Sequence, residues 1–163
     1  MEPNRFLKSQ EYWIDTVKSE LKSRKKVSHW IWFIFPQLRG LGESPMSDYY
    51  GLDGIEDAEE YYKHRQLRKN LEGCLSIVCE YKDVRQVKDC LGELDTMKLH
   101  SCASLFYLAT KKSIFKHVIK KFFNGVLDEK TVLLLKEVSY REKSVCQHSF
   151  ERPFEGANPR FFG

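Results

Sequence analysis

The chain lacks any apolar run long enough to cross a membrane. A spanning helix needs about 20 consecutive apolar residues, and the densest apolar run here, residues 29–35, is far shorter. The N-terminus is polar and charged, without the apolar core of a secretory signal peptide. We therefore expect a cytoplasmic protein with no membrane partner, and access to the nucleus stays open.

The five cysteines lack the spacing of a redox pair or a zinc site. Their number is odd and no secretory signal precedes them, so we expect reduced thiols that mostly pack in the core. Cys102 lacks the flanking motif of a catalytic nucleophile. The sequence therefore predicts no metal site.

The signatures of well-known reactions are also missing. The sequence contains no paired carboxylates, no catalytic triad and no phosphate-loop lysine pattern, and no internal repeat is visible. A net charge of +4 is mild, and amphipathicity alone explains the lysines of residues 113–123. We expect neither a nucleic-acid partner nor a cofactor, and the sequence leaves open whether the protein is an enzyme.

Apolar residues are abundant and predict one folded domain. They make up 42% of the chain, and aromatic residues make up 13%, which argues against disorder. Spacings of three and four between apolar side chains predict a mainly α-helical, compact single-domain fold. The predicted helices cover residues 4–23, 55–63, 67–78, 84–91, 95–106, 113–123 and 128–138. We assign residues 1–138 to this helical domain.

The remaining segment, residues 139–163, is predicted to be an irregular aromatic tail. Helical periodicity disappears after Tyr140. The apolar residues of the tail are scattered among polar ones: Phe150, Pro153, Phe154, Pro159, Phe161 and Phe162. The tail is either an ordered strap over the core or a flexible arm that binds a partner, and composition does not choose between these alternatives.

Aromatic side chains are most concentrated in residues 29–42, which read HWIWFIFPQLRGLG. Burying each large side chain is worth about 1.5–3 kcal/mol, so we expect a core segment with polar residues at its borders. Both faces of the run are apolar, and its periodicity therefore does not distinguish a strand from a helix. Pro36 disfavours the α conformation at Phe35, so we expect the segment to end there.

Polar and aromatic residues around this segment form a candidate pocket. Aromatic rings beside cations suit a small anionic, nucleotide-derived ligand, because a tryptophan can stack on a planar ring and a cation can hold a phosphate. The candidate ligand-binding residues are Lys25, Trp30, Trp32, Gln37, Arg39, Ser44, Tyr50, Lys98 and Ser101. Lys98 and Ser101 either face a cavity or lie at the border of their helix.

His29 is the candidate acid or base. An imidazole has an unperturbed pKa of about 6.5 and titrates near neutrality. The alternative is a histidine that bridges two hydrogen-bond partners at the edge of the core, and the sequence does not separate the two roles.

A second hypothesis is a protein-interaction module. The loop of residues 39–51 and the aromatic tail would form the contact surface, since arginine and aromatic side chains are typical interface anchors.

The order of these features resembles a known family. The resemblance rests on Arg5-Phe6 with Gln10, on the segment from His29 to Gly42, and on residues 97–101 before Leu105-Phe106. On these residues the chain resembles the family called domain of unknown function 1810, over about residues 4–135. It departs from the family pattern at Cys102-Ala103, where serine and methionine are usual.

The resemblance implies a small, mainly helical intracellular domain and supplies no activity. Some family members carry the label calpastatin. We do not transfer that label, because calpastatin inhibitory segments are disordered whereas this sequence is patterned to fold.

Overall fold

The computed structural model confirms the mainly α-helical fold. It describes the backbone of residues 1–155 and the side chains of residues 1–146. Its helices, in chain order, are α1 (Asn4–Ser23), α2 (Ile31–Ile34), α3 (Pro45–Tyr49), α4 (Ile55–Lys63), α5 (Arg65–Cys79), α6 (Val84–Leu91), α7 (Glu93–Thr110), α8 (Ser113–Phe122) and α9 (Glu129–Glu155). Within the described backbone the β structure is one isolated pairing, between Leu38 and Leu52.

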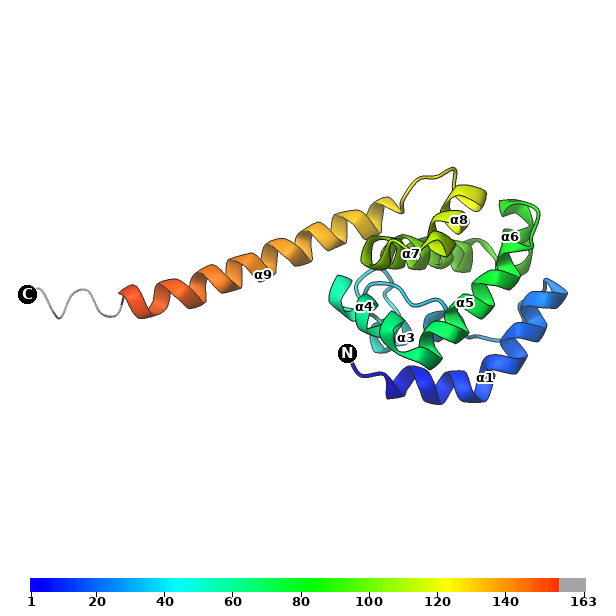
Figure 1. The fold of residues 1–163 in the computed structure, drawn as a ribbon, viewed down its shortest axis with the longest axis horizontal. Helices are drawn as coiled ribbons and strands as arrows, with labels where there is room; N and C mark the ends of the chain where they lie inside the picture. The colour runs from blue at the N-terminus through cyan, green and yellow to red at the C-terminus, as the bar shows by residue number, and fades with distance from the viewer. Residues whose placement is uncertain (156–163) are drawn as a thin grey trace, which may run out of the picture.

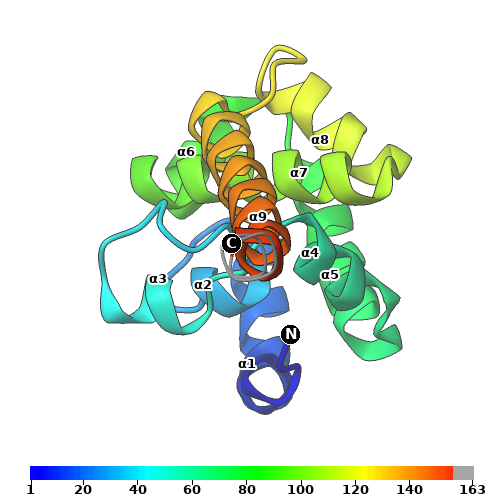
Figure 2. The same cartoon turned by 90° about the vertical axis from the view of Figure 1, so that its left-hand side faces the viewer.

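The body of the molecule is built in layers around α5. Helices α4 and α5 lie between α1 on one side and α7 with α8 on the other (Figure 1). Helix α6 closes the end of the body that lies opposite α9 (Figure 1). The view along α9 shows α2 and α3 together on one flank of this body (Figure 2).

The central aromatic segment lies in the core, where Ile31–Ile34 form the short helix α2. Trp30 and Phe35 are fully buried, and their rings pack edge to face with 6.1 Å between centroids. Helix α2 ends at Phe35, as Pro36 predicts. The segment contributes large buried apolar area from both of its faces, which is why its apolar pattern carried no periodicity.

A buried amide joins this segment to three helices. The side-chain nitrogen of Gln10 donates to the Phe33 carbonyl oxygen at 2.7 Å and to the Tyr61 hydroxyl at 2.8 Å. The Asn70 amide donates to the Gln10 side-chain oxygen at 2.8 Å. Because buried polar groups are costly when unpaired, this network holds α1, α2, α4 and α5 in one register.

Helix α9 extends past the predicted end of the last helix. The sequence analysis ended this helix at Val138, but the backbone stays helical to Glu155. Residues 139–152 contain no proline or glycine, and a helix that leaves the body needs no apolar periodicity to continue. The far half of α9 stands clear of the body (Figure 1). Phe161 and Phe162 lie outside the described residues, as do the side chains of Phe150 and Phe154.

None of the helices within residues 1–155 combines the length and the apolar content that crossing a membrane requires.

Glu20 holds the chain where it turns from α1 into the central segment. Its Oε1 atom accepts the backbone N–H groups of Val27 at 2.7 Å and Ser28 at 2.9 Å, and the Trp30 indole N–H at 3.1 Å. Burial raises the pKa of this carboxyl, but the hydrogen bonds from Ser28, Val27 and Trp30 outweigh burial and leave the pKa below its usual value of 4.5.

We predict that Glu20→Gln lowers the free energy of unfolding by about 1–3 kcal/mol, because three donors lose a charged acceptor. Since the folded-state pKa is lowered, this stabilisation is present above about pH 4.5 and is lost as the pH falls through the folded-state value. Urea unfolding between pH 3 and 7 measures both effects. Glu11→Gln, at an exposed site on α1, serves as the control. Equal acid sensitivity in the two variants would contradict the prediction.

Candidate functional site

Four of the predicted site residues line one hollow of about 380 Å³. Gln37 and Ser44 come from the loop after α2, and Lys98 and Ser101 come from α7. We call this the loop–α7 hollow. Its remaining lining is Leu41, Gly42, Glu43, Ser47, Leu94, Met97, Asp128 and Lys130. Lys98 and Ser101 thus both lie in the lining of this hollow.

Lys98 is the cation of this hollow that has surplus charge. Its ammonium lies 5.1 Å from the centroid of the Trp32 ring and 3.8 Å from the Asp95 carboxylate. The same carboxylate lies closer, at 3.0 Å, to the ammonium of Lys26. Two positive charges therefore share one negative charge, and the Lys98 ammonium remains incompletely neutralised.

Trp32 lies half-buried beneath Lys98, and its indole N–H is buried without a hydrogen-bond partner in the described part of the chain. An unpaired buried donor costs about 1–3 kcal/mol. Such groups are uncommon in folded proteins and occur at sites where a ligand or a water molecule completes the pairing. Trp32 does not itself line the hollow.

Asp128 connects the hollow to α9. Its Oδ2 atom accepts hydrogen bonds from the Ser101 hydroxyl at 2.8 Å, the Thr131 hydroxyl at 2.6 Å and the Thr131 backbone N–H at 3.2 Å. Its own backbone N–H donates to the Ser104 hydroxyl at 2.9 Å. Asp128 thus acts as the N-cap of α9 and also fastens the start of α9 to α7.

Gln37 offers an uncommitted amide in the hollow. The residue is 7% exposed, and its side chain forms no hydrogen bond to any other residue that the structure describes. Its backbone is fixed, because the Leu52 N–H donates to the Gln37 carbonyl oxygen at 3.0 Å and the Arg39 N–H donates to the Leu52 carbonyl oxygen at 2.8 Å. A rigid backbone with a free amide is a typical arrangement for recognising a polar ligand edge.

The loop folds tightly over the hollow because Gly42 and Ser44 are small residues. A Cβ atom at Gly42 would lie 2.3 Å from the Ser47 hydroxyl oxygen and 3.4 Å from the Gln37 side-chain nitrogen. The Ser44 hydroxyl caps α3 by accepting the Ser47 N–H at 3.1 Å, and it donates to the Ser47 hydroxyl at 3.0 Å. The Ser44 hydroxyl is therefore partly committed to its own loop.

Two predicted site residues are buried in the core, away from the hollow. Trp30 has no exposed surface and cannot stack on a ligand. The ring of Tyr50 packs on Phe6 and Phe33, and its hydroxyl pairs with Ser9 at 2.6 Å. The sequence does not show which side of an aromatic-rich segment faces the core, and this is why both residues looked available.

Three further predicted residues lie on the surface and outside this lining. Lys25 and His29 are exposed, and neither lines the hollow. Arg39 binds within its own loop: it donates to the carbonyl oxygens of Asp48 at 3.1 Å and Gly51 at 2.9 Å, and it pairs with Asp53 at 3.0 Å. Its guanidinium is therefore occupied.

The sequence analysis missed Lys130 and the position of Asp128 in the lining of the hollow. Asp128 carried a signal only as a helix cap, and Lys130 follows it within the first turn of α9. Nothing in the sequence brings residues 128–130 beside residues 37–44, since only the return of the chain across α7 places them together.

The described residues do not favour thiol chemistry either. Burial raises the pKa of the Cys102 thiol well above its usual value, which disfavours a nucleophilic thiolate. Among the residues that the structure describes, no three His, Cys, Asp or Glu side chains gather in a way that could hold a metal ion. What the hollow offers is two lysines, the carboxylates of Glu43 and Asp128, hydroxyls, an amide and apolar walls.

Two comparisons relate this chain to known proteins. The family model described as "Protein of unknown function (DUF1810)" matches residues 1–135. The chain is also similar to the conserved hypothetical protein Rv1873 from Mycobacterium tuberculosis, known from a crystal structure, with 36% sequence identity and a TM-score of 0.77. The match covers 82% of this chain and 95% of that one. The comparison with curated proteins gave no match.

We predict that Gly42→Ala destabilises the protein by about 1–3 kcal/mol, because the added methyl group meets Ser47 and the loop must shift. Gly54→Ala is the matched control, since its Cβ would meet only Val138 at 3.9 Å, and we expect a change of about 0.5 kcal/mol or less. Thermal unfolding compares the two variants. If both change the melting temperature equally, the loop is not packed as described.

Proposed function

This chain belongs to DUF1810, a family of proteins of unknown function, and we propose that it binds a small anionic, nucleotide-derived molecule in the loop–α7 hollow. The observation that carries the proposal is the surplus charge on Lys98. Lys98 lines the hollow, and its only ion-pair partner among the described residues, Asp95, is shared with Lys26.

Lys130 supports the same assignment. It lines the hollow from the first turn of α9 and is exposed, without an ion pair to any described residue. A cation in the first turn opposes the helix dipole, whose N-terminal end is itself positive. An anion in the hollow would relieve both this opposition and the surplus charge on Lys98.

The rest of the lining suits the uncharged part of such a ligand. Leu94 is 73% exposed and Met97 is 53% exposed, so they offer an apolar wall against which a planar ring can pack. The Gln37 amide and the carboxylates of Glu43 and Asp128 can pair with polar ring edges and hydroxyls. A volume of about 380 Å³ lies in the usual range for small-molecule sites.

The proposal is binding, and it assigns no reaction. His29 does not line the hollow, and its role as an acid or base stays a prediction. In the ligand-binding set we keep Gln37, Lys98 and Ser101, with Ser44 as a loop cap and Trp32 as the ring beneath Lys98. A cytoplasmic location likewise stays a prediction.

A second candidate function, a protein-interaction module, has support from one feature. The far half of α9 projects from the body, which is the form of an arm offered to another molecule (Figure 1). The loop of residues 39–51 gives this second function less support. The guanidinium of Arg39 already contacts Asp48, Gly51 and Asp53 within the same loop region.

Thermal unfolding of the full chain against nucleoside mono- and diphosphates, their uncharged nucleosides and inorganic phosphate tests the proposal. A ligand at 100 times its dissociation constant adds about 2.7 kcal/mol of stability. We expect stabilisation by a phosphorylated compound, its loss in Lys98→Ala, and its retention in Lys25→Ala, which removes an exposed lysine outside the hollow.

Two results would contradict binding in this hollow. One is the absence of stabilisation across the whole panel. The other is an equal loss of stabilisation in the Lys98 and Lys25 variants, which would indicate a diffuse charge effect rather than a site.

A further inference from the structure

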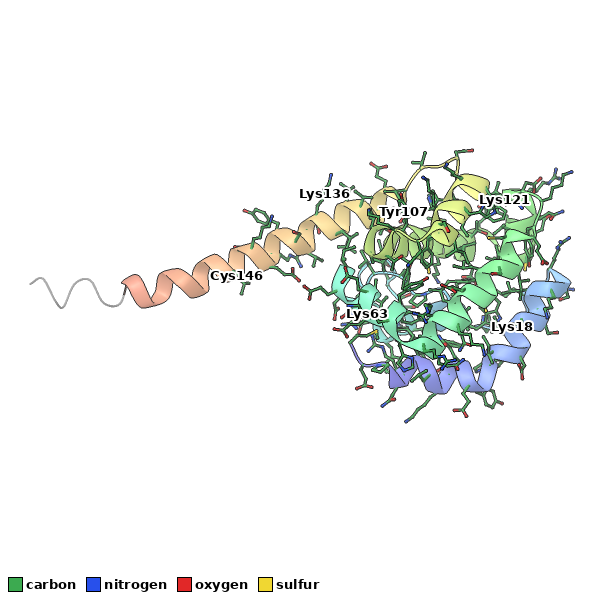
Figure 3. All side chains as sticks on the ribbon, in the orientation of Figure 1. Lys18, Lys63, Tyr107, Lys121, Lys136 and Cys146 are labelled. Atoms are coloured by element: carbon green, nitrogen blue, oxygen red, sulfur yellow. The ribbon has the colours of Figure 1, made fainter. Side chains whose placement is uncertain are left out.

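The start of α9 forms a wall of the loop–α7 hollow and is also where α9 is fastened to the body. Asp128 accepts from Ser101 and donates to Ser104, and both of these serines belong to α7. Ser139 and Glu142 still lie beside the start of α4, and the far half of the helix stands clear of the body (Figure 1). Figure 3 shows Lys136 where α9 passes the rim of the body and Cys146 well beyond it. The direction of the projecting helix is therefore set within its first turns.

The two cations of the hollow come from the two helices that this fastening joins. Lys98 belongs to α7 and Lys130 belongs to the first turn of α9. Neither ammonium is fully neutralised within the described residues: Lys98 shares Asp95 with Lys26, and Lys130 has no ion pair. Both lysines line the hollow together with the carboxylates of Glu43 and Asp128. The part of the repulsion between the lysines that these carboxylates do not offset works against the docking of α9 on α7.

We infer that the ligand carries two anionic groups, which bridge Lys98 and Lys130, and that its binding fixes the start of α9 against α7. This inference rests on the proposed function, and it adds the charge pattern of the ligand and a consequence of its binding. A nucleoside diphosphate has the required pattern. Its phosphates replace the repulsion between the two ammonium groups by attraction to both, while its ring lies along Leu94 and Met97.

Ligand binding and the docking of α9 are then thermodynamically linked. If Lys130 contributes a given factor to affinity, the ligand must suppress undocking of the first turns of α9 by the same factor, because the coupling is reciprocal. The effect is confined to the start of the helix, where Asp128 and Thr131 lie.

Hydrogen exchange of the full chain with and without adenosine diphosphate tests this coupling, and adenosine is the uncharged control. We expect the diphosphate to slow exchange of backbone amides in residues 129–136 by about tenfold, and adenosine to leave them unchanged. Lys130→Ala should weaken diphosphate binding by about the same factor and abolish the slowing. Lys136→Ala, on the same helix but outside the hollow, should change neither quantity.

The outcomes separate this inference from the proposed function. If the diphosphate stabilises the protein through Lys98 but leaves exchange at residues 129–136 unchanged, the coupling is wrong and the binding site stands. If Lys130→Ala leaves affinity unchanged, the bridge between the two lysines is likewise excluded. If no phosphorylated compound binds, the proposed function fails and the inference fails with it.

Discussion

A single buried amide determines where the central segment of this protein can lie. Gln10 donates to the backbone of α2 and to Tyr61 of α4, and it accepts from Asn70 of α5. The aromatic run that follows α1 is apolar on both faces and would tolerate more than one position in a core. Hydrogen bonds tolerate far less displacement, because an unmade one leaves a desolvated polar group. The network therefore selects one register, and the loop that forms the hollow starts from that register at Gln37.

On the other side of the segment, two lysines share one carboxylate. Trp30 and Trp32 each lie beneath a lysine, Lys26 and Lys98, and the two lysines meet at the one carboxylate of Asp95. Lys26 is the structural member, since its side chain is 8% exposed and also donates to the Ser28 carbonyl oxygen at 2.7 Å. Lys98 is the member left facing a cavity. The Asp95 carboxylate therefore takes part in the structural ion pair with Lys26 and also pairs with Lys98, the candidate binding cation.

The sequence predicted the helices best where apolar spacing and end signals agreed. Residues 4–23, 55–63 and 84–91 match α1, α4 and α6, since each combines a clear apolar stripe with a stop such as Gly92. Helix α9 was predicted too short because the sequence of its far half has no apolar stripe with helical periodicity. A projecting helix is recognisable only by the absence of helix breakers, which is a weaker signal than periodicity.

The site was predicted in part for a related reason. Gln37, Ser44, Lys98 and Ser101 were selected as candidates, and the structure places them around one hollow. Their chemistry was visible in the sequence, but burial was not. The same chemistry therefore also selected Trp30 and Tyr50, which are buried in the core. Lys130 was missed because it becomes a neighbour of Lys98 only through the packing of α9 on α7.

Because α9 is long, a small tilt at its start displaces its far end by a large distance. A helix of 27 residues is about 40 Å long, and the hydrogen bond between Ser101 and Asp128 that fastens this one to α7 lies at its start. Such a helix is a lever: a tilt of about 10° at the attachment would carry the far end through about 7 Å, by the geometry of a rigid rod of this length. Small rearrangements among Ser101, Asp128 and Thr131 would thus be magnified into displacements comparable with the width of a side chain.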